Sequence, residues 1–141
     1  MAQTSVAPII LRDVLLTIGG IGGVASATAD FEKHVSQVEF TPSAAVQTWK
    51  GLTPAAVFSK GTTATWTCTL AYAQDWETTD SLSQFLHDQE GEEVSCTFEP
   101  VKGGATWAAT LLITPGAVGG TVDAFAVATV TLGVAGKPTL S

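Results

Sequence analysis

The chain has 141 residues, the usual size of one domain, and its net charge of −7 comes from 13 acidic against six basic residues. Six scattered basic residues exclude a protein that holds nucleic acid by its phosphates, since phosphate binding needs clustered Lys or Arg. The apolar stretch 9–27 is interrupted by Arg12, Asp13 and four glycines, and it falls short of the roughly 20 continuous apolar residues of a spanning helix. We therefore expect a single domain over residues 1–141 with no membrane insertion.

No basic residue precedes the apolar stretch, so a secretion signal is not expected and the chain should be made in a cytoplasm. Cys68 and Cys96 are then expected to be reduced and buried. A disulfide between neighbouring strands is the alternative for these two residues.

Two strands are expected in the first third of the chain. Residues 12–18 form the first and end at the Gly-rich turn 19–23, and residues 31–41 form the second. The segment 43–60 follows. It is too long for a simple turn, and its aromatic and aliphatic side chains argue against disorder, so we interpret it as a long functional loop.

The clearest strand covers residues 62–72, where large and small side chains alternate. Period two places Cys68 and Leu70 on one face and Thr67 and Thr69 on the other. One face is therefore expected to be core, and the other a ladder of small hydroxyls.

One helix is expected, capped by Asp80 and stopped by Gly91, with an apolar stripe of Leu82, Phe85 and Leu86. Three further strands are expected at 94–99, 105–114 and 121–134. Residues 1–10 and 135–141 are expected to be terminal arms. About six or seven strands with one flanking helix predict a mostly β protein, a β-sandwich or rolled barrel.

Residues that could carry catalysis are few, and no catalytic, cofactor-binding or metal site is expected. Glu92 and Glu93 are adjacent on an expected strand and so point to opposite faces, which does not suit a pair of acids sharing one substrate. His34, expected in the second strand, and His87, on the helix, lack metal-ligand spacing. The glycines at 19–23 have neither the spacing nor the following helix of a dinucleotide-binding loop.

Three segments in order resemble the major tail tube protein of long-tailed, non-contractile bacteriophages (siphophages), especially phages of actinobacteria. They are the strand Thr65–Trp76, the helix Asp80–Leu86, and Ile113–Gly120 leading into Val130–Leu132 and Gly136–Pro138. The resemblance covers residues 60–140 well, and the first 60 residues fit only in general order.

The resemblance implies a β-sandwich with one helix that assembles as hexameric rings stacked into a hollow tube through which double-stranded DNA passes. It implies a place in the virion after assembly in the host cytoplasm, with the tape measure, tail terminator and tail tip proteins as further partners. In this family a long loop and the chain termini bridge subunits and rings. Trp49, Leu52 and Phe58 of the loop 43–60 are the candidates for such contacts.

A tube that passes DNA needs an acidic or neutral lumen, because attraction repeated in every ring would sum to a large drag. The candidates for lining it are Glu32 and Glu39, on the expected second strand, and Asp123, at the start of the expected last strand. Glu32 and Glu39 are seven residues apart, so on a regular strand at most one of them points inward.

Two other function classes stay open on the sequence. A head-decoration or adhesin domain of similar β-sandwich form would not polymerise. An enzyme such as a small glycan hydrolase would need two carboxylates facing each other across a cleft.

Overall fold

The computed structural model of the chain describes residues 3–20 and 27–141. It is mostly β-structure with one short helix, α1 (Leu82–Asp88). The ten strands are β1 (Leu15–Gly19), β2 (Thr28–Asp30), β3 (Val35–Ser43), β4 (Val46–Lys50), β5 (Val57–Gly61), β6 (Thr65–Ala73), β7 (Glu93–Glu99), β8 (Trp107–Leu112), β9 (Val127–Val134) and β10 (Thr139–Leu140).

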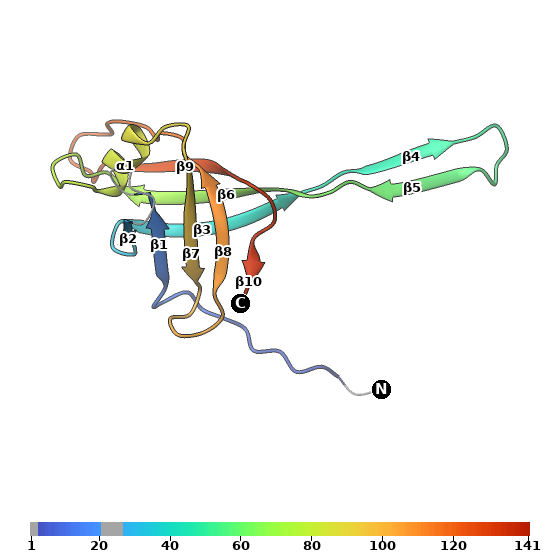
Figure 1. The fold of residues 1–141 in the computed structure, drawn as a ribbon, viewed down its shortest axis with the longest axis horizontal. Coiled ribbons are helices and arrows are strands. Elements are labelled where there is room, and N and C mark those ends of the chain that lie inside the picture. The colour runs from blue at the N-terminus through green and yellow to red at the C-terminus, as the bar shows by residue number, and fades with distance from the viewer. Residues whose placement is uncertain (1–2, 21–26) are drawn as a thin grey trace.

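Eight strands form one antiparallel sheet in the order β2-β1-β7-β8-β9-β6-β3, with β10 added to β8. The sheet bends sharply between β8 and β9, which pair only at Leu111↔Val134 and Leu112↔Gly133. As a result β3, β6 and β9 form one layer, and β1, β7 and β8 cross it in a second layer (Figure 1). Two layers crossing in this way are the orthogonal form of sheet packing, so the expected β-sandwich with one helix is confirmed.

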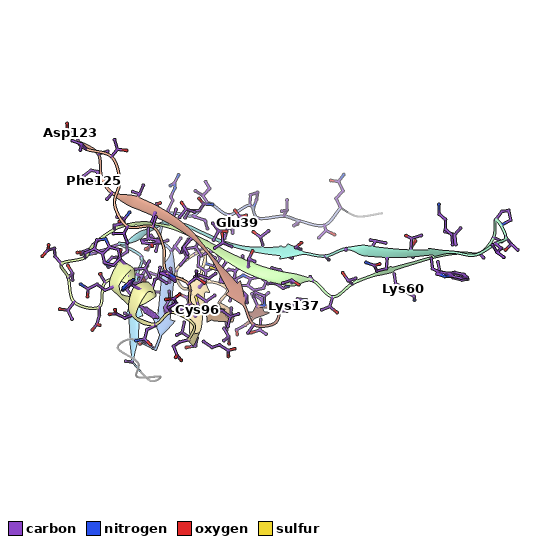
Figure 2. The ribbon with its side chains drawn as sticks, turned by 90° about the horizontal axis from the view of Figure 1, so that it is seen from above. Glu39, Lys60, Cys96, Asp123, Phe125 and Lys137 are labelled. Carbon is purple, nitrogen blue, oxygen red and sulfur yellow. The ribbon has the colours of Figure 1, made fainter. Side chains whose placement is uncertain are left out.

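The two remaining strands, β4 and β5, form a separate two-stranded sheet that continues the direction of β3 and β6. This hairpin projects far from the two layers, as Figures 1 and 2 show from perpendicular directions. We call residues 44–64 the arm, and the rest of the described chain the body.

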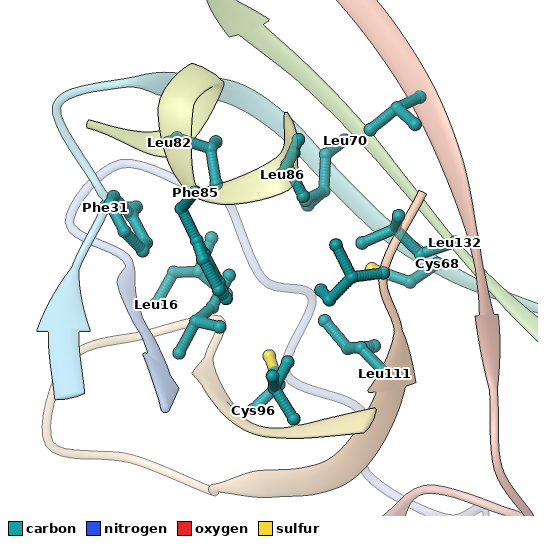
Figure 3. Close-up of a cluster of buried hydrophobic side chains, with 14 of the residues drawn as sticks. Leu16, Phe31, Cys68, Leu70, Leu82, Phe85, Leu86, Cys96, Leu111 and Leu132 are labelled. Atoms are coloured by element: carbon teal, nitrogen blue, oxygen red, sulfur yellow. The ribbon is translucent and has the colours of Figure 1, made fainter. Parts of the chain in front are cut away.

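The core lies between the two layers and is closed by the helix. Figure 3 shows Leu82, Phe85 and Leu86 of α1 directed at side chains from the strands, among them Leu70 and Leu132. The buried cluster consists of Leu16, Ile18, Phe31, Cys68, Leu70, Tyr72, Leu82, Phe85, Leu86, Val94, Cys96, Phe98, Leu111, Ile113, Ala128, Val130, Leu132 and Val134. Burial of this apolar surface is the main force that holds the body together.

Strand β6 fits its sequence pattern well. Cys68, Leu70 and Tyr72 are buried, whereas Thr67 and Thr69 between them lie on the opposite face. Both cysteines are free and buried, as expected for reduced thiols in the core. Burial raises the pKa of Cys68 and of Cys96 to about 12, so neither is a reactive thiolate near neutral pH.

The helix begins one residue later than expected. Ser81 is the N-cap, and its hydroxyl accepts the backbone N–H of Gln84. Asp80, the predicted cap, instead has a positive φ of 59° in the preceding turn. The helix ends at the C-cap Gln89, and Gly91 with φ +84° supplies the left-handed turn beyond it.

Several strand boundaries differ from those expected. Residues 31–34 are a turn and not part of β3, and β2 before them was not predicted. Residues 121–126 precede β9 and are not in a strand. The tail 135–141 is less free than an arm, because β10 pairs with β8 and Pro138 is buried. Residues 21–26 of the Gly-rich turn and residues 1–2 of the N-terminal arm lie outside the described residues.

Candidate assembly interface

The segment expected as a long loop is a regular hairpin in the structure. Its strands pair in register from Val46↔Gly61 to Lys50↔Val57, and a tight turn closes it with Gly51 N–H donating to the carbonyl of Ala56 at 2.6 Å. The hairpin could have been predicted from the sequence. Gly51 and Pro54 are typical turn residues, and they lie in a six-residue connection between two short runs of strand-forming residues.

One threonine links the two strands of the arm at its foot. Pairing lapses between β3 and β4, and between β6 and β5, yet Thr62 bridges the gap to Ala45. The Thr62 N–H and hydroxyl both donate to the Ala45 carbonyl, at 2.8 and 3.0 Å, and the hydroxyl accepts the Ala45 N–H at 2.9 Å. These bonds extend the pairing of the hairpin by one residue pair towards the body.

The arm exposes large apolar side chains. The side chains of Trp49 and Phe58 face each other across the hairpin with ring centroids 5.9 Å apart, and 63% and 60% of their surfaces remain exposed. Leu52 at the turn is fully exposed. The three residues predicted as contacts therefore lie on one projecting element, and their exposed apolar surface makes the arm a candidate interaction surface.

The two faces of the arm differ. The pairing puts Trp49, Phe58 and Lys60 on one face, which we call the aromatic face. Val46, Thr48 and Lys50 lie on the opposite face, where the Thr48 and Ser59 hydroxyls are 3.2 Å apart. Residues 43–64 hold two lysines and no acidic residue, so the arm has a charge of +2.

An apolar groove opens on the body at the root of the arm. It has a volume of about 380 Å³, and its walls come from β3, β6, the β7–β8 turn, the segment before β1 and the tail before β10. Its lining residues are Ile9, Leu11, Val38, Glu39, Phe40, Pro42, Trp66, Phe98, Pro100, Trp107 and Pro138. Sequence reasoning missed this groove, because its walls come from five separate parts of the chain.

A second, larger hollow of about 410 Å³ adjoins the apolar groove and shares four lining residues with it: Leu11, Val38, Glu39 and Phe98. Its lining includes Arg12, Asp13 and Glu32, so it is more polar. Charges of both signs and the lack of a convergent catalytic set among its lining residues do not favour a substrate site.

The outer face of β3, β6 and β9 is rich in threonine and almost uncharged. Rows of paired residues cross the three strands, such as Glu39↔Thr69↔Thr131. Glu39 is the one ionisable side chain among the outward positions of these strands, and it accepts a hydrogen bond from the Thr41 hydroxyl at 3.0 Å. The expected hydroxyl ladder is therefore present, and we call this surface the threonine face.

Of the three predicted lumen residues, only Glu39 lies on the threonine face. Glu32 sits half-buried in the turn before β3, because the strand starts four residues later than expected. Asp123 lies in the loop before β9 with a φ of 64°, so it is not on a strand either. The placement of Glu32 and Asp123 on long strands was wrong.

The loop 115–126 forms a second exposed apolar end, and Figure 2 places its Phe125 far from Lys60 of the arm. Phe125 is 93% exposed, and Val118 and Val122 are also exposed. Gln74 anchors the loop: its side-chain amide donates to the Gly119 and Val127 carbonyls at 2.9 and 3.0 Å. The sequence predicted residues 121–134 as one strand, so it did not anticipate this exposed loop.

The histidines do not converge. His34 packs edge-on against Phe31, and its Nδ1 is buried without a hydrogen-bond partner among the described residues. His87 packs edge-on against Trp76. In the described part of the chain no group of three His, Cys, Asp or Glu is placed to hold a metal ion. Nor does any helix there reach the length and apolarity needed to cross a bilayer.

Comparisons with known proteins bear on the fold. No protein-family model matches the sequence, and no curated protein is similar to it. The structure is similar to a chain in the cryo-EM structure of the sheath/tube terminator of an extracellular contractile injection system, PVC, in its extended state. The two share 14% identity and superpose with a TM-score of 0.61 over 98% of this chain and 99% of the other. Similarity at this level of identity shows a shared fold.

Proposed function

We propose that this chain is a structural subunit of a phage-tail-like tube, specifically the tail tube protein of a siphophage. In this proposal copies form rings, expected to be hexameric, and the rings stack into a hollow virion tube that delivers double-stranded DNA. The tape measure, tail terminator and tail tip proteins are its further partners, and assembly takes place in the host cytoplasm. No catalytic step is assigned to it.

The observation that carries the proposal is the rigid arm that exposes Trp49 and Phe58 to solvent. A monomeric domain gains nothing from holding two aromatic rings in water, whereas aromatic side chains are enriched in the cores of protein interfaces. The fold shared with a chain of an injection-system terminator supports the same class of assembly.

The threonine face supports the role of a DNA conduit. Small hydroxyl side chains and one carboxylate per copy give no attachment point for phosphates, and Glu39 adds a weak repulsion. We assign this face to the lumen, where the Glu39 side chains of all copies in one ring form a ring of negative charge.

A tail terminator that caps the tube as a single ring is the second candidate, because the similar structure comes from a terminator. A cap needs a contact surface on one side only. Here exposed apolar side chains lie at both ends of the molecule, on the arm and on the loop 115–126, which favours a subunit that stacks in two directions.

Electron microscopy of the purified protein at high concentration, with and without a tail initiator complex, tests the proposal. Hollow tubes of variable length are the expected result. Discrete rings that never stack would instead identify a terminator. Monomers or trimers under every condition would contradict both candidates and favour a head-decoration or adhesin domain.

A further inference from the structure

We propose that the arm of one copy docks, by its aromatic face, into the apolar groove of a second copy. The inference deepens the proposed function and rests on its premise that copies of this chain associate. It names the two surfaces that meet, which neither the fold nor the similarity to a terminator specifies.

The groove needs an apolar occupant. It is open to solvent, and its aromatic walls, Phe40, Trp66 and Trp107, are only half-buried by the body. Filling it would remove these rings from water, at a gain of about 25 cal/mol for each Å² of apolar surface covered.

The chain's own arm cannot fill it. The arm leaves the body at Pro42 and Trp66, beside the groove, and then runs straight away from it (Figures 1 and 2). An arm that occupies the groove must therefore come from another copy.

The aromatic face is already shaped for docking. The Trp49 ring lies over Gly51, where an added Cβ would come within 3.2 Å of the indole, and its other neighbour is the Phe58 ring. A side chain held in place before binding loses little rotamer freedom on binding. Clustered aromatic side chains such as these two are typical of residues that dominate the free energy of an interface.

The opposite net charges of the arm and the body favour a second copy of the chain as the partner. The arm carries +2, and the rest of the chain holds the other four basic residues and all 13 acidic ones, a net charge of −9. Lys60 lies on the aromatic face, so the surface that inserts carries one of these two positive charges. A basic arm and an acidic body attract each other, which speeds association and orients it.

The contact has a direction, because the surface that inserts differs from the surface that receives. Each copy offers one arm and one groove, so copies join head to tail. Such contacts close into a ring when the rotation between copies allows it, and otherwise continue as a filament.

Two double variants, each altering one side of the contact, test the inference. Trp49→Ala with Phe58→Ala removes the inserting face, and Ile9→Asp with Leu11→Asp charges the rim of the groove without touching the core, since both residues are more than half exposed. Ile10→Asp is the matched control, because Ile10 is equally exposed but does not line the groove.

Each double variant alone should raise the concentration needed for polymerisation at least about tenfold, the equivalent of one lost interface anchor. Ile10→Asp should polymerise like the unaltered protein. A mixture of the two double variants retains one intact arm and one intact groove, so it should stop at a 1:1 heterodimer. For detection, the groove variant also carries the photo-crosslinker p-benzoylphenylalanine in place of Gln47, which lies on the aromatic face beside the two anchors, and the cross-links should map to groove residues of the other copy.

The outcomes separate this inference from the function. Tubes that form with cross-links outside the groove, or on residues 3–8 of the N-terminal segment, overturn the docking and leave the tube role standing. Cross-linked heterodimers from a protein that never forms tubes support the docking and overturn the tube role. Absence of any association between copies overturns both.

Discussion

The body and the arm use the same kinds of side chain in opposite ways. In the body, Phe31 and Leu70 are buried and the surface is acidic, whereas on the arm Trp49 and Phe58 stand in water beside two lysines. The body therefore gains its stability from apolar residues within one copy. The arm has no core of its own, and its apolar residues can gain free energy only from a partner. In the proposed subunit, folding and assembly therefore depend on separate residues, and we expect that each can be disturbed alone.

The largest effect should come from the core. Leu70→Ala removes a buried side chain from β6 and should lower the free energy of unfolding by about 2–5 kcal/mol. Urea unfolding followed by circular dichroism measures it. Thr69→Ala on the opposite face of the same strand is the control and should change stability by less than about 1 kcal/mol. Equal losses for the two would contradict the division into faces.

The next effect should appear on the arm. Phe58→Ala should weaken association by about 2 kcal/mol, because a truncated aromatic anchor leaves its pocket unfilled. Its unfolding midpoint should stay unchanged, since the side chain is 60% exposed and its ring lies beside Trp49 of the arm and outside the core. Light scattering during polymerisation and urea unfolding give the two numbers. A fall in stability as large as that of a core variant would show that the arm belongs to the folding unit.

A smaller effect is expected at the helix start. Ser81→Ala removes the hydroxyl that accepts the Gln84 N–H and should cost about 1 kcal/mol of stability. Assembly measured well below the unfolding midpoint should be unaffected. Loss of assembly in a folded Ser81→Ala protein would mean that the helix, and not only the arm, contacts a partner.

Charge on the threonine face should affect neither folding nor polymerisation. Glu39→Lys places a positive ring in the proposed lumen and should slow DNA ejection from phage that carry it, more so at low salt where screening is weak. Asp123→Lys, in the loop before β9, is the control and should eject at the normal rate. Normal ejection with Glu39→Lys would place the lumen on another face.

The smallest effect concerns the buried thiols. Their folded pKa of about 12 exceeds the ordinary value of 9.0, so they add stability below pH 9 that is lost as the pH rises from 9 towards 12. Near neutral pH, Cys68 and Cys96 should not react with a thiol reagent until the body unfolds. A cysteine placed on the arm by Ser59→Cys should react at once. Fast labelling of the native cysteines would show that the core opens readily.

The sequence allowed the body to be predicted better than its surfaces. Alternation in β6 was sufficient to place Cys68 and Leu70 in the core, because burial imposes period two on a strand. Glu32 and Glu39 could not be assigned in the same way, since the strand boundary between them depends on the packing of Phe31 under the helix, with its ring stacked 6.1 Å from Phe85.

Of the two surfaces of the candidate interface, only the arm could be predicted from the sequence. Trp49, Leu52 and Phe58 are close together in the chain, so their clustering could be predicted. The groove brings Ile9, Phe40 and Pro138 together from distant segments, and only tertiary structure creates it. Local patterns predict surfaces made of one segment and miss those made of many.

The bridge between Thr62 and Ala45 also has a mechanical consequence. It lies at the foot of a long lever, where any force on the arm tip exerts its greatest torque, and the Thr62 hydroxyl supplies two of the three bonds that resist bending there. If arms link the copies, loss of this hydroxyl loosens the foot of every arm and lowers the flexural stiffness of the polymer. Thr62→Val should keep the shape of the joint but yield polymers that curve more, measurable as a shorter persistence length in micrographs.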